Sequence, residues 1–133
     1  MKHVLLIGLI LAVTLAACGG SATSLTGTTW TVTSLQGVGV DPTVKITAIF
    51  GTDGNISGSG GCNNYTAAYT TSGKDLTVQS PASTMMACSE VVDQQESQYF
   101  YLLEGTGTYE IKGDKLTIKD SSGQTTLEYT SGS

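Results

Sequence analysis

Apolar and polar residues alternate through most of this chain, and turn residues interrupt the alternation at short intervals. Residues 44–51, VKITAIFG, place an apolar side chain at every second position. A period of two is typical of a β-strand with one buried face. Residues 52–54, TDG, follow as a turn signal. The pattern predicts an antiparallel hairpin in which Phe50 faces Ile56 across a three-residue loop.

The second strand of this hairpin carries small residues at the positions that the register turns inward. Continuing the ladder predicts three further pairs: Ala48 with Gly58, Ile46 with Gly60, and Val44 with Cys62. Inward glycines permit a tight bend or the close approach of another element. We therefore expect a strongly curved sheet or partial barrel, with room left for a helix.

Further segments have the composition of strands. Residues 28–33, TTWTVT, are β-branched and aromatic, and residues 76–78 form a short strand. Gly113 and Asp114 suit a two-residue hairpin loop. That loop predicts these pairs: Lys112 with Lys115, Ile111 with Leu116, and Tyr109 with Ile118. The next turn, at residues 120–123, places Leu127 opposite Leu116, and about seven or eight strands are expected in all.

One segment has helical spacing. Ser89 is positioned as its N-cap, and Glu90 and Asp93 place carboxylates in the first turn, where the helix dipole favours them. Gly105 is positioned to end the helix. The residues expected to pack on the sheet are Val92, Glu96, Tyr99, Phe100 and Leu103. The predicted fold class is α+β, a small curved antiparallel β-sheet or partial barrel packed with one α-helix.

The N-terminal residues resemble an export signal. A short basic region precedes an apolar run at residues 4–13, which is shorter than the roughly 20 residues that a membrane-spanning helix needs. Residues 15–18, LAAC, resemble the lipobox of bacterial lipoproteins, in which the signal is removed and the cysteine is acylated. The resemblance implies a signal peptide over residues 1–17 and lipid attachment at Cys18. The alternative is an ordinary signal peptide with an incidental cysteine.

The lipobox interpretation divides the chain into three parts. Residues 1–17 are the lipoprotein signal peptide. Residues 18–26 hold the lipidated cysteine and a flexible tether, because they are small and polar. Residues 27–130 form one folded domain, which is an ordinary size for a single hydrophobic core.

The residue types that are missing after residue 17 narrow the function. The sequence has one histidine, His3, and no arginine. Without histidine, Ser-His-Asp and Cys-His catalysis in their usual forms are excluded, as is the commonest zinc ligand. After residue 17, five lysines against eleven carboxylates leave a formal charge of −6. Nucleic-acid binding relies on clustered Lys and Arg, so this class is not expected.

Two cysteines, Cys62 and Cys88, follow Cys18. Export to an oxidising compartment favours a disulfide between them over a free reactive thiol. Neither belongs to a Cys-x-x-Cys redox motif. A bridge between them would add about 3–4 kcal/mol of stability in the chain-entropy model.

Candidate acid–base and nucleotide sites have ordinary structural interpretations. Residues 58–63 lack the third glycine of a dinucleotide-binding loop. Two carboxylate pairs, Asp93 with Glu96 and Asp114 with Asp120, could act in proton transfer. Solvated surface charge is the more common role of such residues. We therefore expect no catalytic residue, cofactor site or metal site.

Two residue pairs near the cysteines could also contact a ligand. Met85 and Met86 could form an adaptable binding lip, although filling gaps in a core is the more common role of methionine. Asn63 and Asn64 tolerate left-handed backbone and bond to nearby amides, so both are expected to stabilise a turn.

Several segments in a fixed order resemble one known family. The specific ones are Gly61-Cys62-Asn63 and Met86-Ala87-Cys88, and residues 28–35, 50–58 and 109–116 support them. This order is similar to the META domain, the HslJ-like family of bacterial heat-shock-associated lipoproteins. The resemblance spans about residues 25–130.

The resemblance implies a curved antiparallel sheet with one helix, in proteins that are exported or envelope-bound and associated with stress tolerance, secretion or virulence. It carries no catalytic residue over to this chain. Family members often have Arg where Asn64 stands, and a glycine near Ala67 and Ala68. Any binding role of that arginine is therefore not expected here.

These observations predict a non-enzymatic META-domain lipoprotein, held at a membrane through Cys18 and acting as a monomer. Gly19 rather than Asp follows the cysteine, so the outer membrane is expected where the organism has one. The expected role is envelope stress response or integrity, through contact with an envelope protein or a small ligand. The alternatives are a periplasmic inhibitor of a hydrolase, such as a lysozyme or a protease, and a barrel that holds an apolar ligand.

Overall fold

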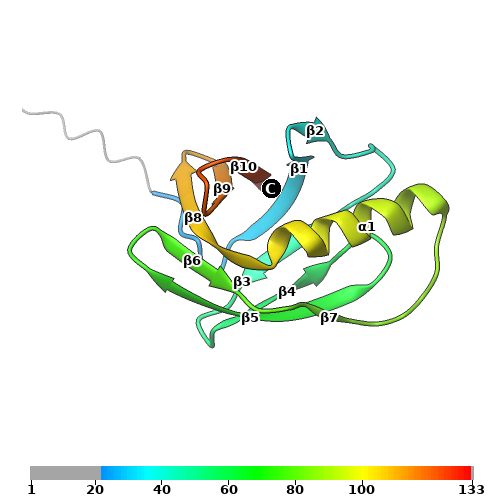
Figure 1. Cartoon of the computed structure of the whole chain (residues 1–133), viewed down its shortest axis with the longest axis horizontal. Helices are drawn as coiled ribbons and strands as arrows, with labels where there is room; N and C mark the ends of the chain where they lie inside the picture. Colours follow the sequence, from blue (N-terminus) through cyan, green and yellow to red (C-terminus); the bar gives the residue numbers. More distant parts are fainter. Residues whose placement is uncertain (1–21, 133) are drawn as a thin grey trace, which may run out of the picture.

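The computed structural model describes residues 22–132, which form ten strands and one helix (Figure 1). In chain order the elements are β1 (Thr29–Leu35), β2 (Val38–Gly39), β3 (Thr47–Phe50), β4 (Asn55–Ser59), β5 (Asn64–Ser72), β6 (Asp75–Val78), β7 (Ala82–Ser83), α1 (Glu90–Leu103), β8 (Gly105–Lys112), β9 (Lys115–Asp120) and β10 (Thr125–Ser131). Strand pairing runs β10-β9-β8-β6-β5-β4-β3-β1, and β1 pairs again with β10. Eight strands therefore close an antiparallel barrel, to which β2 and β7 are additions. The predicted α+β class is confirmed, and the expected partial barrel is closed.

The first predicted hairpin forms with the expected register, but its ladder is shorter. Phe50 pairs with Ile56 and Ile49 with Ser57. β4 ends at Ser59, and the amide of Gly60 donates a hydrogen bond to the backbone carbonyl of Asn63 at 2.8 Å, which closes a turn. The predicted pairs of Ile46 with Gly60 and Val44 with Cys62 are therefore wrong, because the chain leaves the sheet in a turn.

The two inward glycines are nevertheless needed for close approach. A Cβ on Gly58 would collide with the carbonyl oxygen of Thr47 in the neighbouring strand. A Cβ on Gly60 would lie 2.6 Å from the ring of Phe100 and 2.7 Å from a carboxylate oxygen of Glu96. The glycine therefore lets the helix approach the end of β4, as the sequence predicts.

The C-terminal meander follows its predicted pattern up to the last turn. All three predicted pairs between β8 and β9 form, including Ile111 with Leu116. Leu127, however, pairs with Ile118, and Tyr129 takes the place opposite Leu116. An irregularity between Thr125 and Leu127 shifts the register. The predicted pair of Leu127 with Leu116 is therefore wrong, because a local bulge cannot be counted from the turn alone.

The helix begins and ends as predicted. The hydroxyl oxygen of Ser89 accepts a hydrogen bond from the amide of Val92 at 3.4 Å. Glu104 is the C-cap, and Gly105 follows with a φ of 127°, which a side chain disfavours. In Figure 1, α1 lies across the barrel between β1 and β10 on one side and β4 and β5 on the other.

The barrel interior is filled with side chains. Eight large residues are almost completely shielded from solvent: Trp30, Ile46, Phe50, Ile56, Tyr99, Leu116, Leu127 and Tyr129. The ring of Tyr99, from the helix, packs edge-on against those of Tyr65 and Tyr129. Each such side chain contributes about 1.5–3 kcal/mol through burial. This aromatic cluster attaches the helix to the barrel.

The fold begins slightly earlier than the sequence predicts. Leu25 is buried, and its carbonyl oxygen accepts a hydrogen bond from the indole of Trp30 at 3.1 Å. Thr26 forms an isolated bridge with Phe50. Residues 24–26, assigned above to the tether, are thus part of the folded domain.

Two predictions lie outside the described residues, namely the signal peptide over residues 1–17 and the lipid attachment at Cys18. Within residues 22–132, no helix has the length and apolar character needed to cross a membrane.

Candidate functional site

The two motif segments of the sequence meet at a disulfide. Cys62 and Cys88 are bonded, with their Cα atoms 5.9 Å apart. The bond joins the turn after β4 to the segment that precedes α1. The predicted disulfide is confirmed, and it closes a loop from residue 62 to residue 88, which we call the disulfide loop.

A buried carboxylate holds the first motif segment against the helix. One oxygen of Glu96, Oε2, accepts hydrogen bonds from the amides of Cys62 at 3.0 Å and Asn63 at 2.6 Å. The other, Oε1, accepts one from the side-chain amide of Asn63 at 2.6 Å. Hydrogen bonds to an ionised group are roughly twice as strong as neutral ones. Glu96 is only 7 % exposed, so the interpretation of this residue as solvated surface charge is wrong.

Asn63 connects both motif segments. Besides its bond to Glu96, its side-chain nitrogen donates to the carbonyl of Met86 at 3.0 Å. Its side-chain oxygen accepts from the amide of Met86 at 2.7 Å and from the hydroxyl of Thr84 at 2.9 Å. The predicted turn role is confirmed for the backbone carbonyl of Asn63, which accepts a hydrogen bond from the amide of Gly60. Its side chain does more than stabilise the turn, because it fixes the backbone around Met86.

The remaining motif positions are backbone and surface residues. Gly61 has a φ of 116°, and a Cβ there would lie 2.9 Å from the side chain of Val44. Ala87 is exposed, and so is Asn64, the first residue of β5. The carbonyl of Asn64 accepts a hydrogen bond from the amide of Thr84 at 3.2 Å. This backbone contact joins β5 to the residue that follows β7, so it is a contact between strands, and the turn-stabilising role expected of Asn64 stays a prediction.

The two methionines lie outside the core. Met85 is 93 % exposed and Met86 is 62 % exposed. The core-filling role that the sequence favours is therefore wrong for both. The physical reason is that Asn63 and the disulfide hold this backbone at the edge of the barrel, which leaves the side chains no interior to enter.

The other carboxylate candidates do not converge on a reaction site. Asp93 accepts hydrogen bonds from the amide of Cys88 at 3.0 and 3.3 Å. It lies near both sulfurs, but sulfurs joined to each other are not thiolate ligands. Asp114 lies in the turn before β9 and Asp120 is the last residue of that strand, so the two carboxylates do not form the candidate pair. Asp120 accepts hydrogen bonds from Ser122 and Gln124, which lower the pKa of its carboxyl group. These bonds stabilise the turn after β9.

Buried tyrosines form the polar centre of the core. The hydroxyls of Tyr65 and Tyr99 lie 2.6 Å apart, and that of Tyr129 donates to Tyr99 at 3.4 Å. Burial raises the pKa of all three phenols. The three side chains are almost completely buried, so their main role is packing within the core. The core role predicted for Tyr99 and Phe100 is confirmed.

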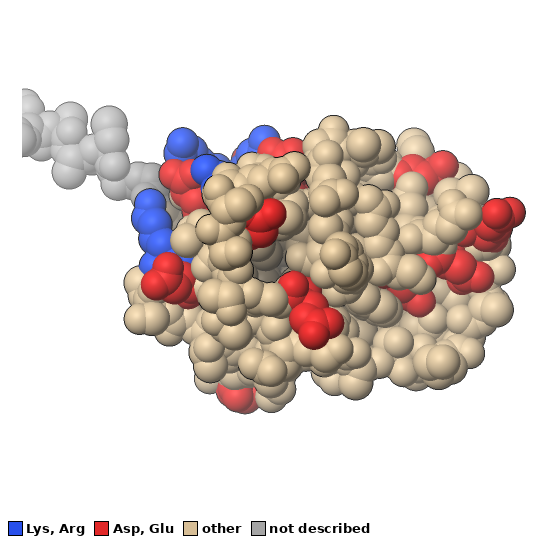
Figure 2. Space-filling model, in the orientation of Figure 1, with Lys and Arg blue, Asp and Glu red and all other residues tan. Residues whose placement is uncertain are grey.

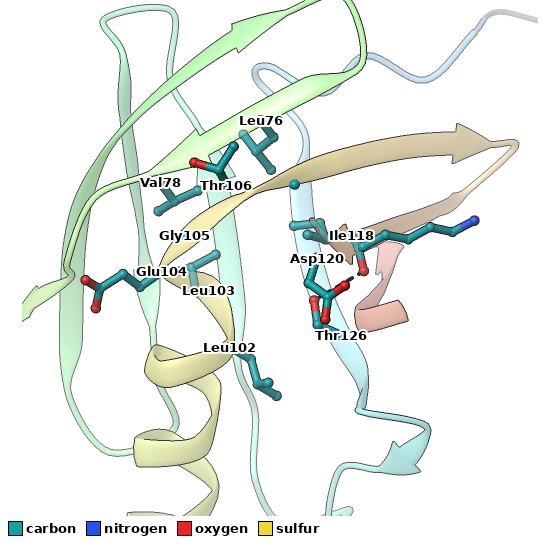
Figure 3. Close-up of a pocket in the computed structure, with 12 residues that line it drawn as sticks. Leu76, Val78, Leu102, Leu103, Glu104, Gly105, Thr106, Ile118, Asp120 and Thr126 are labelled. Atoms are coloured by element: carbon teal, nitrogen blue, oxygen red, sulfur yellow. Dashed lines mark hydrogen bonds between the residues drawn. The ribbon is translucent and has the colours of Figure 1, made fainter. Parts of the chain in front are cut away.

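A small hollow opens where α1 passes into β8. Its floor is apolar, from Leu76, Val78, Leu103 and Ile118, and its volume is about 50 Å³ (Figure 3). That is enough for a few water molecules but far below the roughly 300–1,000 Å³ of ligand pockets. In Figure 3 the side chains of Glu104 and Asp120 lie on different sides of it and do not converge. Figure 2 shows a depression with acidic side chains on either side.

Sequence reasoning missed the central role of Glu96. A signal was present, because this carboxylate lies on the same helical face as Val92, Tyr99 and Leu103. A charged residue in the middle of an apolar face has to find buried partners. Its partners come from a turn 33 and 34 residues earlier in the chain, and no local pattern identifies them.

Comparison with solved structures shows the same fold. One NMR structure is 23 % identical, with a TM-score of 0.61 over 77 % of this chain and 87 % of the other. Another, of a protein from Burkholderia xenovorans, is 21 % identical, with a TM-score of 0.64 over 82 % and 84 % of the two chains. A comparison with curated proteins gives no match.

Comparison with protein families gives a match over nearly the whole described domain. The model of the META domain aligns with residues 23–132. This range contains both motif segments, the disulfide and all ten strands. The chain therefore belongs to the META domain family.

Proposed function

We propose that this protein is a non-enzymatic lipoprotein of the cell envelope, which acts in envelope stress response or integrity by contacting another protein or a small molecule. The observation that carries this proposal is the filled barrel. Trp30, Tyr99 and Tyr129 occupy its interior and are 0 % exposed. A partner must therefore be bound at the outer surface.

The chemistry of the described residues favours contact over turnover. Glu96 is committed to three hydrogen bonds within the fold, and Asp93 to the amide of Cys88. The sequence has a single histidine, His3, within the predicted signal peptide. A general base near neutral pH needs a group such as imidazole or a carboxylate poised beside substrate. The described carboxylates named here are already used to build turns and loops.

The anchor in this proposal is lipid on Cys18. Three residues separate Cys18 from Ala22, and the four steps from one Cα to the next can span at most about 14 Å. Because the fold begins near Ser24, the barrel would lie close to the membrane surface. The residue after the cysteine is Gly19 rather than Asp, which supports anchoring in the outer membrane where the organism has one.

The hydrolase inhibitor remains a second candidate. The exposed segment around Met85 and the acidic side chains of the surface favour it, because electrostatic complementarity guides binding to basic enzymes. Inhibition assays against a panel of lysozymes and proteases test this candidate. The apolar-ligand barrel has less support, since aromatic side chains take up the interior.

Two experiments test the main proposal. Labelling of cells with a clickable fatty acid should tag the protein and leave the Cys18→Ser variant untagged. Pull-down of the tagged, lipid-free domain from envelope extract, read by mass spectrometry, should recover a reproducible partner. Absence of labelling would contradict the anchor. A domain that recovers no specific partner and converts a tested substrate would contradict the binding role.

A further inference from the structure

The charges of the described residues are unevenly distributed between the two ends of the barrel. Lys74, Lys112 and Lys115 lie at the β5–β6 and β8–β9 turns, and Lys119 lines a hollow together with Lys74. We call this the turn end. The three lysines of its turns lie near five carboxylates: Asp53, Asp75, Glu110, Asp114 and Glu128. Lys119 lies between the two ends, because it also lines a hollow with Glu104 and Asp120. In Figure 2 the basic side chains gather where β6, β8 and β9 lie in Figure 1.

The end that carries the helix is strongly acidic. It holds one lysine, Lys45, against six carboxylates: Asp41, Glu90, Asp93, Glu96, Glu104 and Asp120. Five net negative charges therefore lie at this end and two at the turn end, with Lys119 counted at neither. On the face shown in Figure 2, the charged side chains at the N-terminal end of α1 are acidic.

Exposed apolar side chains gather on the same acidic end. Large hydrophobic residues with high exposure include Met85 at 93 %, Tyr101 at 80 %, Val38 at 70 %, Met86 at 62 % and Val91 at 46 %. All five belong to α1 or to the segments beside it. Val38 belongs to the β1–β2 hairpin, whose Gln36 lines a hollow together with Tyr101.

The outer face of the helix between these residues is uncharged. Val91, Gln94, Gln98 and Tyr101 follow at spacings of three and four residues, which places them on one helical stripe. Glu90 and Glu104 lie at its two ends. We call Met85, Met86, Val91 and Tyr101, with Glu90 and Glu104 as their rim, the helix surface.

The helix surface has the anatomy of a protein interface. Interface centres are poor in charge and rich in Tyr, Met and other large side chains, and their rims are polar. The backbone of Met86 is fixed in advance by Asn63 and the disulfide. Such preorganisation lowers the entropy cost of binding.

We propose that the helix surface binds a basic protein that presents an apolar patch bordered by Lys or Arg. The inference rests on the proposed binding function and gives it a surface and a partner class. Complementary charge determines the choice of partner, because the rim offers carboxylates and the helix has no basic residue in its last turn. A second copy of this chain would bring the same acidic rim into contact and would be repelled.

The test uses the purified full chain and two helical peptides as probes. One peptide places Lys and Leu on one face, and the other has the same charge with Ser in place of Leu. Titration should show binding of the Lys/Leu peptide that weakens with salt, and much weaker binding of the Lys/Ser peptide. Tyr101→Ser should weaken binding about tenfold. The matched control is Ile49→Thr, at a 37 % exposed strand residue outside the helix surface, and should leave the Kd unchanged.

A matched pair of charge variants separates the surface from general acidity. Removing two carboxylates in Glu90→Gln/Glu104→Gln should weaken binding roughly two- to fivefold per residue. The Asp75→Asn/Asp114→Asn variant removes the same charge from the turn end and should have no effect. Equal weakening by both variants, equal binding of both peptides, or absence of peptide binding would overturn the inference. Recovery of a partner in the pull-down would then leave the proposed function standing without this surface.

Discussion

Glu96 shows how one residue can organise two distant segments. Its carboxylate takes three hydrogen bonds from Cys62 and Asn63, and it comes from the middle of the buried face of α1. Asn63 then passes the restraint on to Met86. The motif around Cys62 is therefore explained by structure, because these residues hold the disulfide loop in place.

Replacing Glu96 with glutamine should destabilise the fold. The variant keeps the size of the side chain but loses its charge. It also replaces one carboxylate oxygen with an NH₂ group, which would face an N–H donor of Cys62 or Asn63 instead of accepting its hydrogen bond. We expect the free energy of unfolding to fall by about 1–3 kcal/mol. Urea denaturation measures it, with the exposed Gln98→Ala as the control. A change as small as that of the control would show that the charge of Glu96 is not needed.

The buried tyrosines predict how stability depends on pH. Burial raises the pKa of Tyr65, Tyr99 and Tyr129 above the ordinary value of 10.0. In the unfolded chain these phenols ionise near pH 10, whereas in the folded chain they stay protonated to a higher pH. Their contribution to the free energy of unfolding is therefore complete below about pH 10 and is lost as the pH rises further. Denaturation midpoints should therefore fall above about pH 10. Phenolate absorbance from all six tyrosines in the still-folded protein would contradict this.

At the scale of elements, short-range features could be predicted from the sequence and long-range ones could not. The Gly113-Asp114 hairpin and the helix from Ser89 to Gly105 are set by adjacent residues, and both form as predicted. The position of Leu127 depends on a bulge, and barrel closure depends on pairing of β1 with β10 across nearly the whole domain. The exposure of Met85 follows from contacts of Asn63 that no local pattern reveals.

The contact between α1 and the end of β4 depends on Gly60. A methyl group there would overlap with Phe100 and Glu96, so one of them must move. We expect Gly60→Ala to lower the free energy of unfolding by about 1–3 kcal/mol, as overpacking does. Gly39→Ala is the matched control, because the nearest atom to its added methyl group is 4.0 Å away. Thermal unfolding measures the stability of both variants. Equal stability would show that the helix lies farther from the end of β4 than described.

At the scale of the molecule, the barrel separates packing from recognition. Aromatic side chains fill its interior. Most of the net negative charge and most of the exposed large apolar side chains lie at the end that carries the helix. The chain enters the fold near Ser24, beside the first strand, and β1 pairs with the last strand to close the barrel. A lipid on Cys18 would hold this domain by its N-terminus and leave the helix surface for contact with a partner.

Site-specific photo-crosslinking in intact cells tests this contact most directly. A photoreactive amino acid replaces Tyr101 on the helix surface or, as the control, Thr52 in the β3–β4 turn. We expect ultraviolet light to join the protein to a basic partner from position 101 and not from position 52, with a lower yield in the Glu90→Gln/Glu104→Gln background. Adducts from position 52 alone, or no adduct from position 101, would contradict the account.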